Sequence, residues 1–283
     1  MSLGIFLISA VIGAGPNNGG AVLPLPGIHR PAPAAFGKPP RSRYSLTIPL
    51  DPPRAGLPRP RIFGPAGRPL VVIDPGHGGH DPGAIASTGA VREKDVTLAV
   101  AMAIRDELLR SGRVRVALTR EDDRFLILHE RAGIARAVGA NLFISVHADS
   151  APNENASGAT VYTLSDTASS REALLYAQRE NSADIVNGVN LGMQEQGTAA
   201  ILMDLAQRET RNASASFAEL LRREGQILVP FRTDALRRAG FVVLRAPDTP
   251  AVLLEMGYLS NKDDVKRLPS PQGRAAIAVA TSR

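Results

Sequence analysis

The sequence predicts an α/β fold, a single domain with a mostly parallel twisted sheet flanked by helices, plus a long helical insertion. Two observations carry this prediction. From residue 68 onward, short β-branched runs alternate with stretches of helical apolar spacing. Loops rich in glycine and proline follow several of these runs, as expected where buried strands end. With 283 residues and 44% hydrophobic content, the chain is long enough to bury one good core.

The first 67 residues differ in composition from the rest. Proline is dense between Pro16 and Pro69, so residues 1–67 are predicted to be a Pro-rich linker or a disordered N-terminal segment. Residues 3–14 are apolar, but no Lys or Arg precedes them, so they are either a disordered start or a truncated export signal. No stretch reaches the ~20 apolar residues of a membrane helix, and no membrane span is expected. The folded domain is expected to cover residues 68–283.

The elements of this domain follow from their apolar patterns. In the stretch after Glu93, the residues Val96, Val100 and Ile104 recur at helical spacing, and Gly112 ends the helix. Helices are expected at residues 93–109, 126–138 and 272–280. Strands are expected at residues 70–73, 114–118, 141–146, 160–164, 241–244 and 252–255.

Residues 169–240 break this alternation. They contain no strong strand candidate, and Ser169 with Glu172 predicts a capping-box start for the first of three helices. The three helices are expected at residues 172–186, 199–209 and 213–229. A connection of this length exceeds a usual crossover, so the segment is interpreted as an insertion with its own purpose.

Composition excludes several classes of site and partner. The chain has no cysteine, which rules out disulfides, thiolate zinc sites and cysteine nucleophiles. Its net charge is +6 and its pI is near 10.1. No run of Lys and Arg with interleaved aromatic residues is present, so a diffuse basic surface is favoured over a nucleic-acid patch.

Four polar residues stand where a predicted strand ends or a helix begins. His77 follows the strand at 70–73, Glu93 starts the first helix, His147 follows the strand at 141–146, and Glu255 ends the strand at 252–255. In a parallel sheet these positions share one rim, where open α/β sheets bind ligands. Two histidines and a carboxylate suit zinc. Glu255, held near a zinc-bound water, is the candidate for moving its proton.

Spacing alone leaves a structural interpretation open. A single histidine after a strand is more often a hydrogen-bonded structural group than a ligand, and the separations match no short zinc signature. His29, His80 and His129 are expected to be such structural or surface groups.

Four sequence motifs resemble a known family. In order, they are Ile73-Asp74-Pro75-Gly76-His77-Gly78-Gly79, Arg92-Glu93-Lys94-Asp95, Ser145-Val146-His147-Ala148-Asp149 and Leu254-Glu255-Met256-Gly257-Tyr258-Leu259-Ser260-Asn261. Together they are similar to the signatures of zinc-dependent N-acetylmuramoyl-L-alanine amidases, bacterial cell-wall enzymes of the type used in daughter-cell separation. The resemblance runs from about Leu70 to the C-terminus.

This resemblance implies a reaction and a role for each residue. The zinc ligands would be His77, Glu93 and His147, and the catalytic glutamate would be Glu255. The reaction would be hydrolysis of the amide between N-acetylmuramic acid and L-alanine in peptidoglycan, in the periplasm. A monomeric enzyme is expected.

Part of the insertion also resembles division amidases that carry a regulatory helical segment. The matching stretches are Arg179-Glu180-Asn181-Ser182-Ala183-Asp184 and Ile201-Leu202-Met203-Asp204-Leu205-Ala206-Gln207. The resemblance implies autoinhibition that a periplasmic coiled-coil activator relieves. Glu180, with Glu195 as the runner-up, would occupy the open zinc position; the alternative is that Glu180 is a solvated helix residue. Ile201, Leu202 and Leu205 would either bind the activator or pack on the domain.

Two other functions remain open. One is a catalytically inactive cell-wall-binding module of the same fold, although all four chemical positions are filled. The other is a zinc peptidase or deacylase that acts on a different amide.

Overall fold

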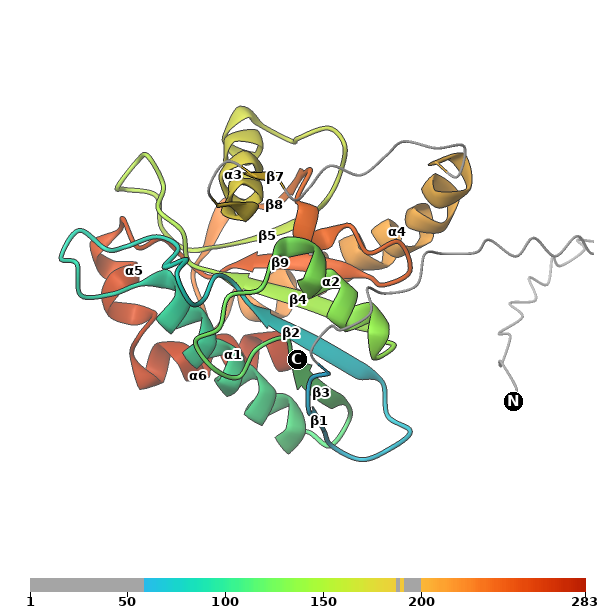
Figure 1. The fold of residues 1–283 in the computed structure, drawn as a ribbon. Coiled ribbons are helices and arrows are strands. Elements are labelled where there is room, and N and C mark those ends of the chain that lie inside the picture. Colours follow the sequence, from blue (N-terminus) through green and yellow to red (C-terminus); the bar gives the residue numbers. More distant parts are fainter. Residues whose placement is uncertain (1–58, 187–188, 191–199) are drawn as a thin grey trace, which may run out of the picture. The chain divides into compact units, whose positions relative to one another are not determined.

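A computed structural model describes residues 59–186, 189–190 and 200–283. Its centre is a seven-stranded sheet with the strand order β1-β3-β2-β4-β9-β5-β8 (Figure 1). In chain order these strands are β1 (Ile62–Phe63), β2 (Leu70–Pro75), β3 (Arg115–Leu118), β4 (Leu142–His147), β5 (Ala159–Leu164), β8 (Phe231–Ala239) and β9 (Ala251–Glu255). Two further short strands, β6 (Ile185–Val186) and β7 (Val189–Asn190), pair with each other.

The sheet is mostly parallel. Strands β3, β2, β4 and β9 are parallel to their neighbours in this order, and β8 is parallel to β5. Strand β5 is antiparallel to β9, and β1 is antiparallel to β3. The predicted fold class is confirmed.

Helices cover both faces of the sheet, so its inner strands β2, β4 and β9 are buried on both sides. The described helices are α1 (Glu93–Arg110), α2 (Leu128–Ala137), α3 (Arg171–Asn181), α4 (Ala200–Gly225), α5 (Lys262–Arg267) and α6 (Pro271–Ser282). One apolar cluster joins α1, α4 and α6 to side chains such as Val71 and Ile73. The other joins α2 and α3 to the alternate side chains, such as Leu70 and Val72.

Most predicted elements lie where their patterns place them, but the segment 169–240 differs. Residues 231–239 form β8, a strand of the main sheet, so the predicted extent of the insertion was wrong. The strand was missed because β8 is an edge strand rich in charged residues, and only Ala235, Arg237 and Ala239 of its second half are buried.

The helices of this segment also differ in extent. The first ends at Asn181 rather than at residue 186, and its N-cap is Ser170 rather than Ser169. The two helices predicted at 199–209 and 213–229 are one continuous helix, α4.

Residues 241–244 were predicted to be a strand, but Val242–Leu244 form a 3-10 turn. The last pair between β5 and β8 joins Leu164 to Ala239, so no strand remains for the next residues to pair with. Their apolar side chains are buried against the α2 and α3 side of the sheet instead.

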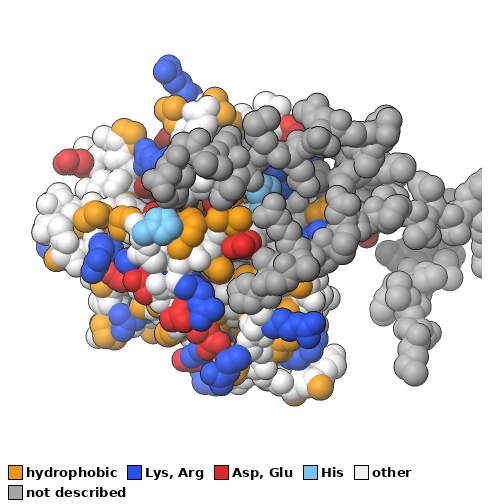
Figure 2. Space-filling view, viewed as in Figure 1, with side chains coloured by type: hydrophobic (Ala, Val, Ile, Leu, Met, Phe, Trp, Pro, Cys, Tyr) orange, Lys and Arg blue, Asp and Glu red, His pale blue; other side chains and the backbone are white. Residues whose placement is uncertain are grey.

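At the N-terminal side, β1 lies in the sheet although it precedes the predicted boundary at residue 68. Residues 1–58 lie outside the described part of the chain, so the prediction of a linker there stays a prediction. On the face that Figure 2 shows, Lys and Arg side chains are interspersed with Asp and Glu. The described helices include none with the length and apolar character of a membrane-crossing segment.

Candidate metal centre

The loop after β2 brings His77 to the carboxyl rim of the sheet. His77 has a φ of 61°, a left-handed conformation that is uncommon outside glycine and that is associated with functional sites. Gly76 lies against the next strand, where an added Cβ would stand 2.4 Å from Cε1 of His147. A glycine at this position therefore lets the two histidines approach one another.

The predicted ligands converge. Nε2 of His77 lies 3.2 Å from Oε2 of Glu93, and Nδ1 of His147 lies 3.1 Å from Oε1 of Glu93. Backbone N–H groups of Ala84 and Ala148 donate to the two oxygens of Glu93 and fix its carboxylate. All three predicted ligands are buried.

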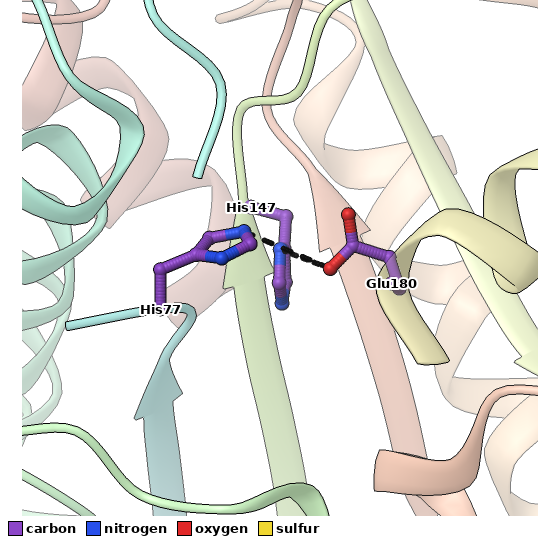
Figure 3. A group of neighbouring side chains, drawn as sticks. All are labelled: His77, His147 and Glu180. Atoms are coloured by element: carbon purple, nitrogen blue, oxygen red, sulfur yellow. Dashed lines mark ion pairs between the residues drawn. The ribbon is translucent and has the colours of Figure 1, made fainter. Parts of the chain in front are cut away.

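Glu180 joins the two histidines from α3 (Figure 3). Its Oε2 lies 3.2 Å from Nδ1 of His147 and 3.7 Å from Nε2 of His77. The ligand atoms of His77, His147 and Glu180 lie within 4.8 Å of one another, a spacing that could hold a metal ion. Glu180 is 4% exposed, so it is not the solvated helix residue of the alternative interpretation. Glu195 lies outside the described residues.

The electrostatics of this cluster favour a cation. Burial opposes charge on His77, but the carboxylates of Glu93, Asp81 and Glu180 outweigh burial and raise the pKa of His77 well above its usual value. Burial likewise opposes charge on Glu93, but the two imidazoles lower its pKa well below the usual value. Three carboxylates, those of Asp81, Glu93 and Glu180, thus face two imidazoles. A divalent cation would balance the excess negative charge.

A buried nitrogen supports the fit to zinc. Nδ1 of His77 pairs with Oδ2 of Asp81 at 2.8 Å, which directs Nε2 toward the other candidate ligands. A carboxylate that holds the second nitrogen of a zinc-bound imidazole is a common arrangement. Nε2 of His77 is buried and has no well-aligned hydrogen bond among the described residues. Imidazole nitrogens and carboxylate oxygens are the donor set that zinc prefers.

Glu255 lies at the end of β9, directly opposite His147 of β4 in the sheet register. It is fully buried. Its Oε1 accepts a hydrogen bond from the backbone N–H of Asp149 at 2.8 Å, and its Oε2 accepts one from Tyr176 Oη at 2.5 Å. Burial, followed by the carboxylates of Glu93 and Asp149, raises the pKa of Glu255 well above its usual value.

Sequence reasoning missed several residues of this site. Asp81 was passed over although it stands four residues after His77 in the same loop. Tyr176 stands one helical turn before Glu180, a signal that becomes meaningful only once α3 is known to lie on the site. Arg179 of α3 donates to Oδ2 of Asp149 at 2.7 Å. Burial, together with Glu180 and Glu93, raises the pKa of Asp149 to about 7.

The other histidines take no part in the described cluster. His80 packs its ring against Phe125 with centroids 4.2 Å apart. His129 lies in α2, outside the group of candidate ligands. His29 lies outside the described residues.

Comparison with known proteins agrees with the motifs. The model of the N-acetylmuramoyl-L-alanine amidase family matches residues 71–283. The chain is 36% identical over 226 residues to N-acetylmuramoyl-L-alanine amidase AmiA of Escherichia coli, which covers 80% of this chain and 78% of AmiA. It is 38% identical over 213 residues to N-acetylmuramoyl-L-alanine amidase AmiC of Neisseria meningitidis, covering 75% of this chain and 50% of AmiC.

Solved structures show the same fold. N-acetylmuramoyl-L-alanine amidase AmiC2 of Nostoc punctiforme superposes with a TM-score of 0.57 at 29% identity, over 77% of this chain and 96% of that one. The catalytic domain of the amidase CwlV of Bacillus (Paenibacillus) polymyxa gives a TM-score of 0.54 at 28% identity, over 76% of this chain and 95% of that one.

Fold and comparisons together define an enzyme of the class of cell-wall hydrolases. More particularly, the chain belongs to the N-acetylmuramoyl-L-alanine amidase family, and its substrate is peptidoglycan.

Proposed function

We propose that the chain cleaves the amide between N-acetylmuramic acid and L-alanine with one zinc ion held by His77, Glu93 and His147. The observation that carries this proposal is the convergence of the two imidazoles on the Glu93 carboxylate within 3.2 Å, on one rim of the sheet. When bound, zinc would polarise the carbonyl of the scissile amide and make hydroxide available near neutral pH.

The chain supplies the proton transfer. Glu255 accepts a proton from the attacking water and passes it to the leaving amine of L-alanine as the amide C–N bond breaks. Burial, followed by the carboxylates of Glu93 and Asp149, raises the pKa of Glu255 and so favours the protonated form that acts as a general acid. The backbone N–H of Asp149 holds Oε1 in place.

We further propose that the structure is an autoinhibited state. Glu180 stands within 3.2 Å of His147, where its carboxylate competes with water for the open position of the metal. On the same helix, Tyr176 donates to Oε2 of Glu255 and holds the oxygen that would move the proton. Helix α3 therefore blocks the metal position and the proton relay at once.

Replacing Glu180 tests this autoinhibition. Glu180→Ala is expected to raise basal hydrolysis of murein sacculi in the absence of any activator, because the competing ligand is gone. The measurement is dye release from labelled sacculi. Basal activity equal to that of the wild type would contradict the role of α3 as an autoinhibitory lid over the site.

The surroundings of the enzyme follow from its substrate. We propose that the chain acts in the periplasm during cell separation, as a monomer, and that a coiled-coil activator draws α3 from the site. The apolar side chains expected either to bind the activator or to pack on the domain lie in α4 but outside the described part of the structure: Ile201, Leu202 and Leu205.

One experiment tests the enzyme itself. The purified chain should bind one equivalent of zinc and release stem peptides from sacculi, and His147→Ala should lose both properties. His80→Ala is the matched control, because His80 is exposed and outside the cluster. Zinc binding without peptide release from the Glu180→Ala variant would favour the inactive binding module. Cleavage of a different amide in muropeptides would favour the peptidase or deacylase.

A further inference from the structure

Helix α3 presents three polar side chains to the sheet on a single face. Glu172, Tyr176 and Glu180 are spaced four residues apart, so they lie one above the other along the helix. Glu180 reaches the candidate metal centre and Tyr176 reaches Glu255. Glu172 contacts residues of β8 that lie outside the candidate metal centre.

Glu172 lies between two arginines of β8. Nη1 of Arg232 donates to its Oε1 at 2.9 Å, and Nη1 of Arg237 lies 2.8 Å from its Oε2. The Arg237 side chain is 4% exposed and that of Arg232 is 18% exposed, whereas that of Glu172 is 39% exposed. The two cations thus belong to the sheet, where Asp234 of β8 also pairs with both of them, and the Glu172 carboxylate comes from the helix that covers the sheet.

The surface beneath α3 connects these arginines to the catalytic rim. The ring of Tyr176 stacks on Tyr162 at 5.5 Å and meets Tyr258 edge-on at 6.5 Å. The guanidinium of Arg232 lies over the Tyr258 ring, 5.6 Å from its centroid. The rings of Tyr162 and Tyr258 and the paired arginines therefore form a row of contacts beneath α3, a path that Tyr176 joins to Glu255.

Polar atoms on this path lack good partners. Oγ1 of Thr160 and Oη of Tyr162 are buried without a well-aligned hydrogen bond among the described residues, whereas Nη1 of Arg237 has the Glu172 carboxylate as its partner. Buried polar groups in native proteins are normally paired, so these two hydroxyls leave hydrogen-bonding capacity open beside the arginines.

We propose that Arg232 and Arg237 form a subsite for a carboxylate of the peptidoglycan stem peptide, and that Glu172 occupies this subsite while α3 covers the sheet. The proposal rests on the proposed amidase function. Eight residues of helix separate Glu172 from Glu180, a rise of about 12 Å. An extended peptide covers this length in three to four residues. The carboxylate would therefore belong to the third or fourth residue beyond the scissile amide.

In this arrangement α3 imitates the substrate along its length. Glu180 stands where the reacting carbonyl binds, Tyr176 covers the proton relay, and Glu172 stands where the peptide carboxylate binds. The helix and an acidic stem peptide then compete for the same surface.

The test compares muropeptides whose stem carboxylates are free or amidated. Closure of α3 lowers kcat/KM for both substrates by the same factor, so their ratio reports the subsite alone. Zinc-loaded wild type is expected to favour the free acid by about 10- to 100-fold, the range for a hydrogen bond to a charged group. Arg232→Gln should bring the ratio close to one through KM, and Arg232→Lys should restore most of it.

Arg238→Gln is the matched control, because Arg238 is the exposed neighbour of Arg237 on the same strand and should keep the wild-type ratio. Equal rates for free and amidated substrates in the wild type would overturn the subsite while leaving the amidase function intact. An equal loss in Arg232→Gln and Arg238→Gln would overturn it too. Failure to cleave either substrate would count against the proposed function instead.

A binding measurement decides the subsite independently of catalysis. Calorimetric titration of the zinc-loaded protein with the released acidic tetrapeptide, a product without the scissile amide, should show about tenfold tighter binding for Glu172→Gln, because the internal competitor has lost its charge. Glu219→Gln, an exposed change on α4, should bind as the wild type does. Unchanged affinity in Glu172→Gln would overturn the proposal.

Discussion

Asp74 organises the loop that carries His77. Its buried carboxylate accepts hydrogen bonds from Thr119 at 2.6 Å and from Ser145 at 2.8 Å, and it pairs with Arg131 of α2 at 3.0 Å. Arg131 in turn donates to the backbone oxygens of Pro75 and His77. One charged pair thus joins β2, β4, the residue that follows β3, helix α2 and the ligand loop.

Removing this charge is expected to destabilise the whole domain. Asp74→Asn keeps the shape but leaves Arg131 as an uncompensated buried cation, which costs about 3–5 kcal/mol of unfolding free energy. Urea unfolding measures the loss. Arg223→Ala, which breaks an exposed pair with Glu224, should change stability by less than about 0.5 kcal/mol. Similar losses in both variants would contradict the organising role of Asp74.

The close approach of Gly76 to His147 is expected to matter for zinc binding. Gly76→Ala would place a methyl group 2.4 Å from the His147 ring, so that the ring must move away from Glu93. We expect zinc affinity to fall at least tenfold, a typical effect of displaced ligand geometry. Gly240→Ala is the control, because its added Cβ meets nothing closer than 3.7 Å. Unchanged zinc affinity in Gly76→Ala would show that the close approach is unimportant.

Helix α3 begins at a defined cap. Oγ of Ser170 accepts a hydrogen bond from the backbone N–H of Ala173, and loss of such a cap costs about 1 kcal/mol. Helix α6, on the opposite face of the sheet, has the same cap at Ser270, whose Oγ accepts from Gly273. The two caps are therefore a matched pair that differs in the surface each helix covers.

Replacing each cap in turn distinguishes a general loss of stability from displacement of α3 over the site. Ser170→Ala should raise basal hydrolysis of sacculi about fivefold, because about 1 kcal/mol shifts the closed-to-open equilibrium by that factor. Ser270→Ala removes an equivalent cap and should lower the melting temperature as much as Ser170→Ala does, but it should not raise activity. Activation by both variants, or by neither, would contradict the role of α3.

The elements of the sheet were predictable where their residues are buried on both faces, as in β2 and β4, because continuous apolar runs have few alternatives. The convergence of His77, Glu93, His147 and Glu255 followed from the shared rim of parallel strands. Strand β8 was not predictable in this way, because its pairing with β5 depends on a distant partner and its charged residues pair across to α3. The roles of Arg232 and Arg237 were hidden for the same reason.

At the scale of the whole molecule, bound zinc is expected to be part of the fold. Its candidate ligands come from β2, α1 and β4 with their adjoining loops, so binding joins segments that unfolding separates. At a free zinc concentration about 1,000 times the dissociation constant, the native state gains about 4 kcal/mol. Chelation should then lower the melting temperature by about 8–16 °C for a domain of this size.

Scanning calorimetry with and without chelator measures this shift. His147→Ala should show no shift, whereas His80→Ala should show the full shift of the wild type. A melting temperature that ignores chelation in the wild type would contradict a tightly bound ion at this rim.

The place of α3 in the chain limits how far it can travel. The helix belongs to the connection that leaves the sheet at the end of β5 and returns at the start of β8, and these two strands pair with each other. In the proposed mechanism, a displaced α3 remains tethered at both ends and keeps a high effective concentration over the site. Reclosure is then a unimolecular step whose rate is independent of enzyme concentration. An activator must consequently stay bound throughout turnover, and its dissociation is enough to silence the enzyme.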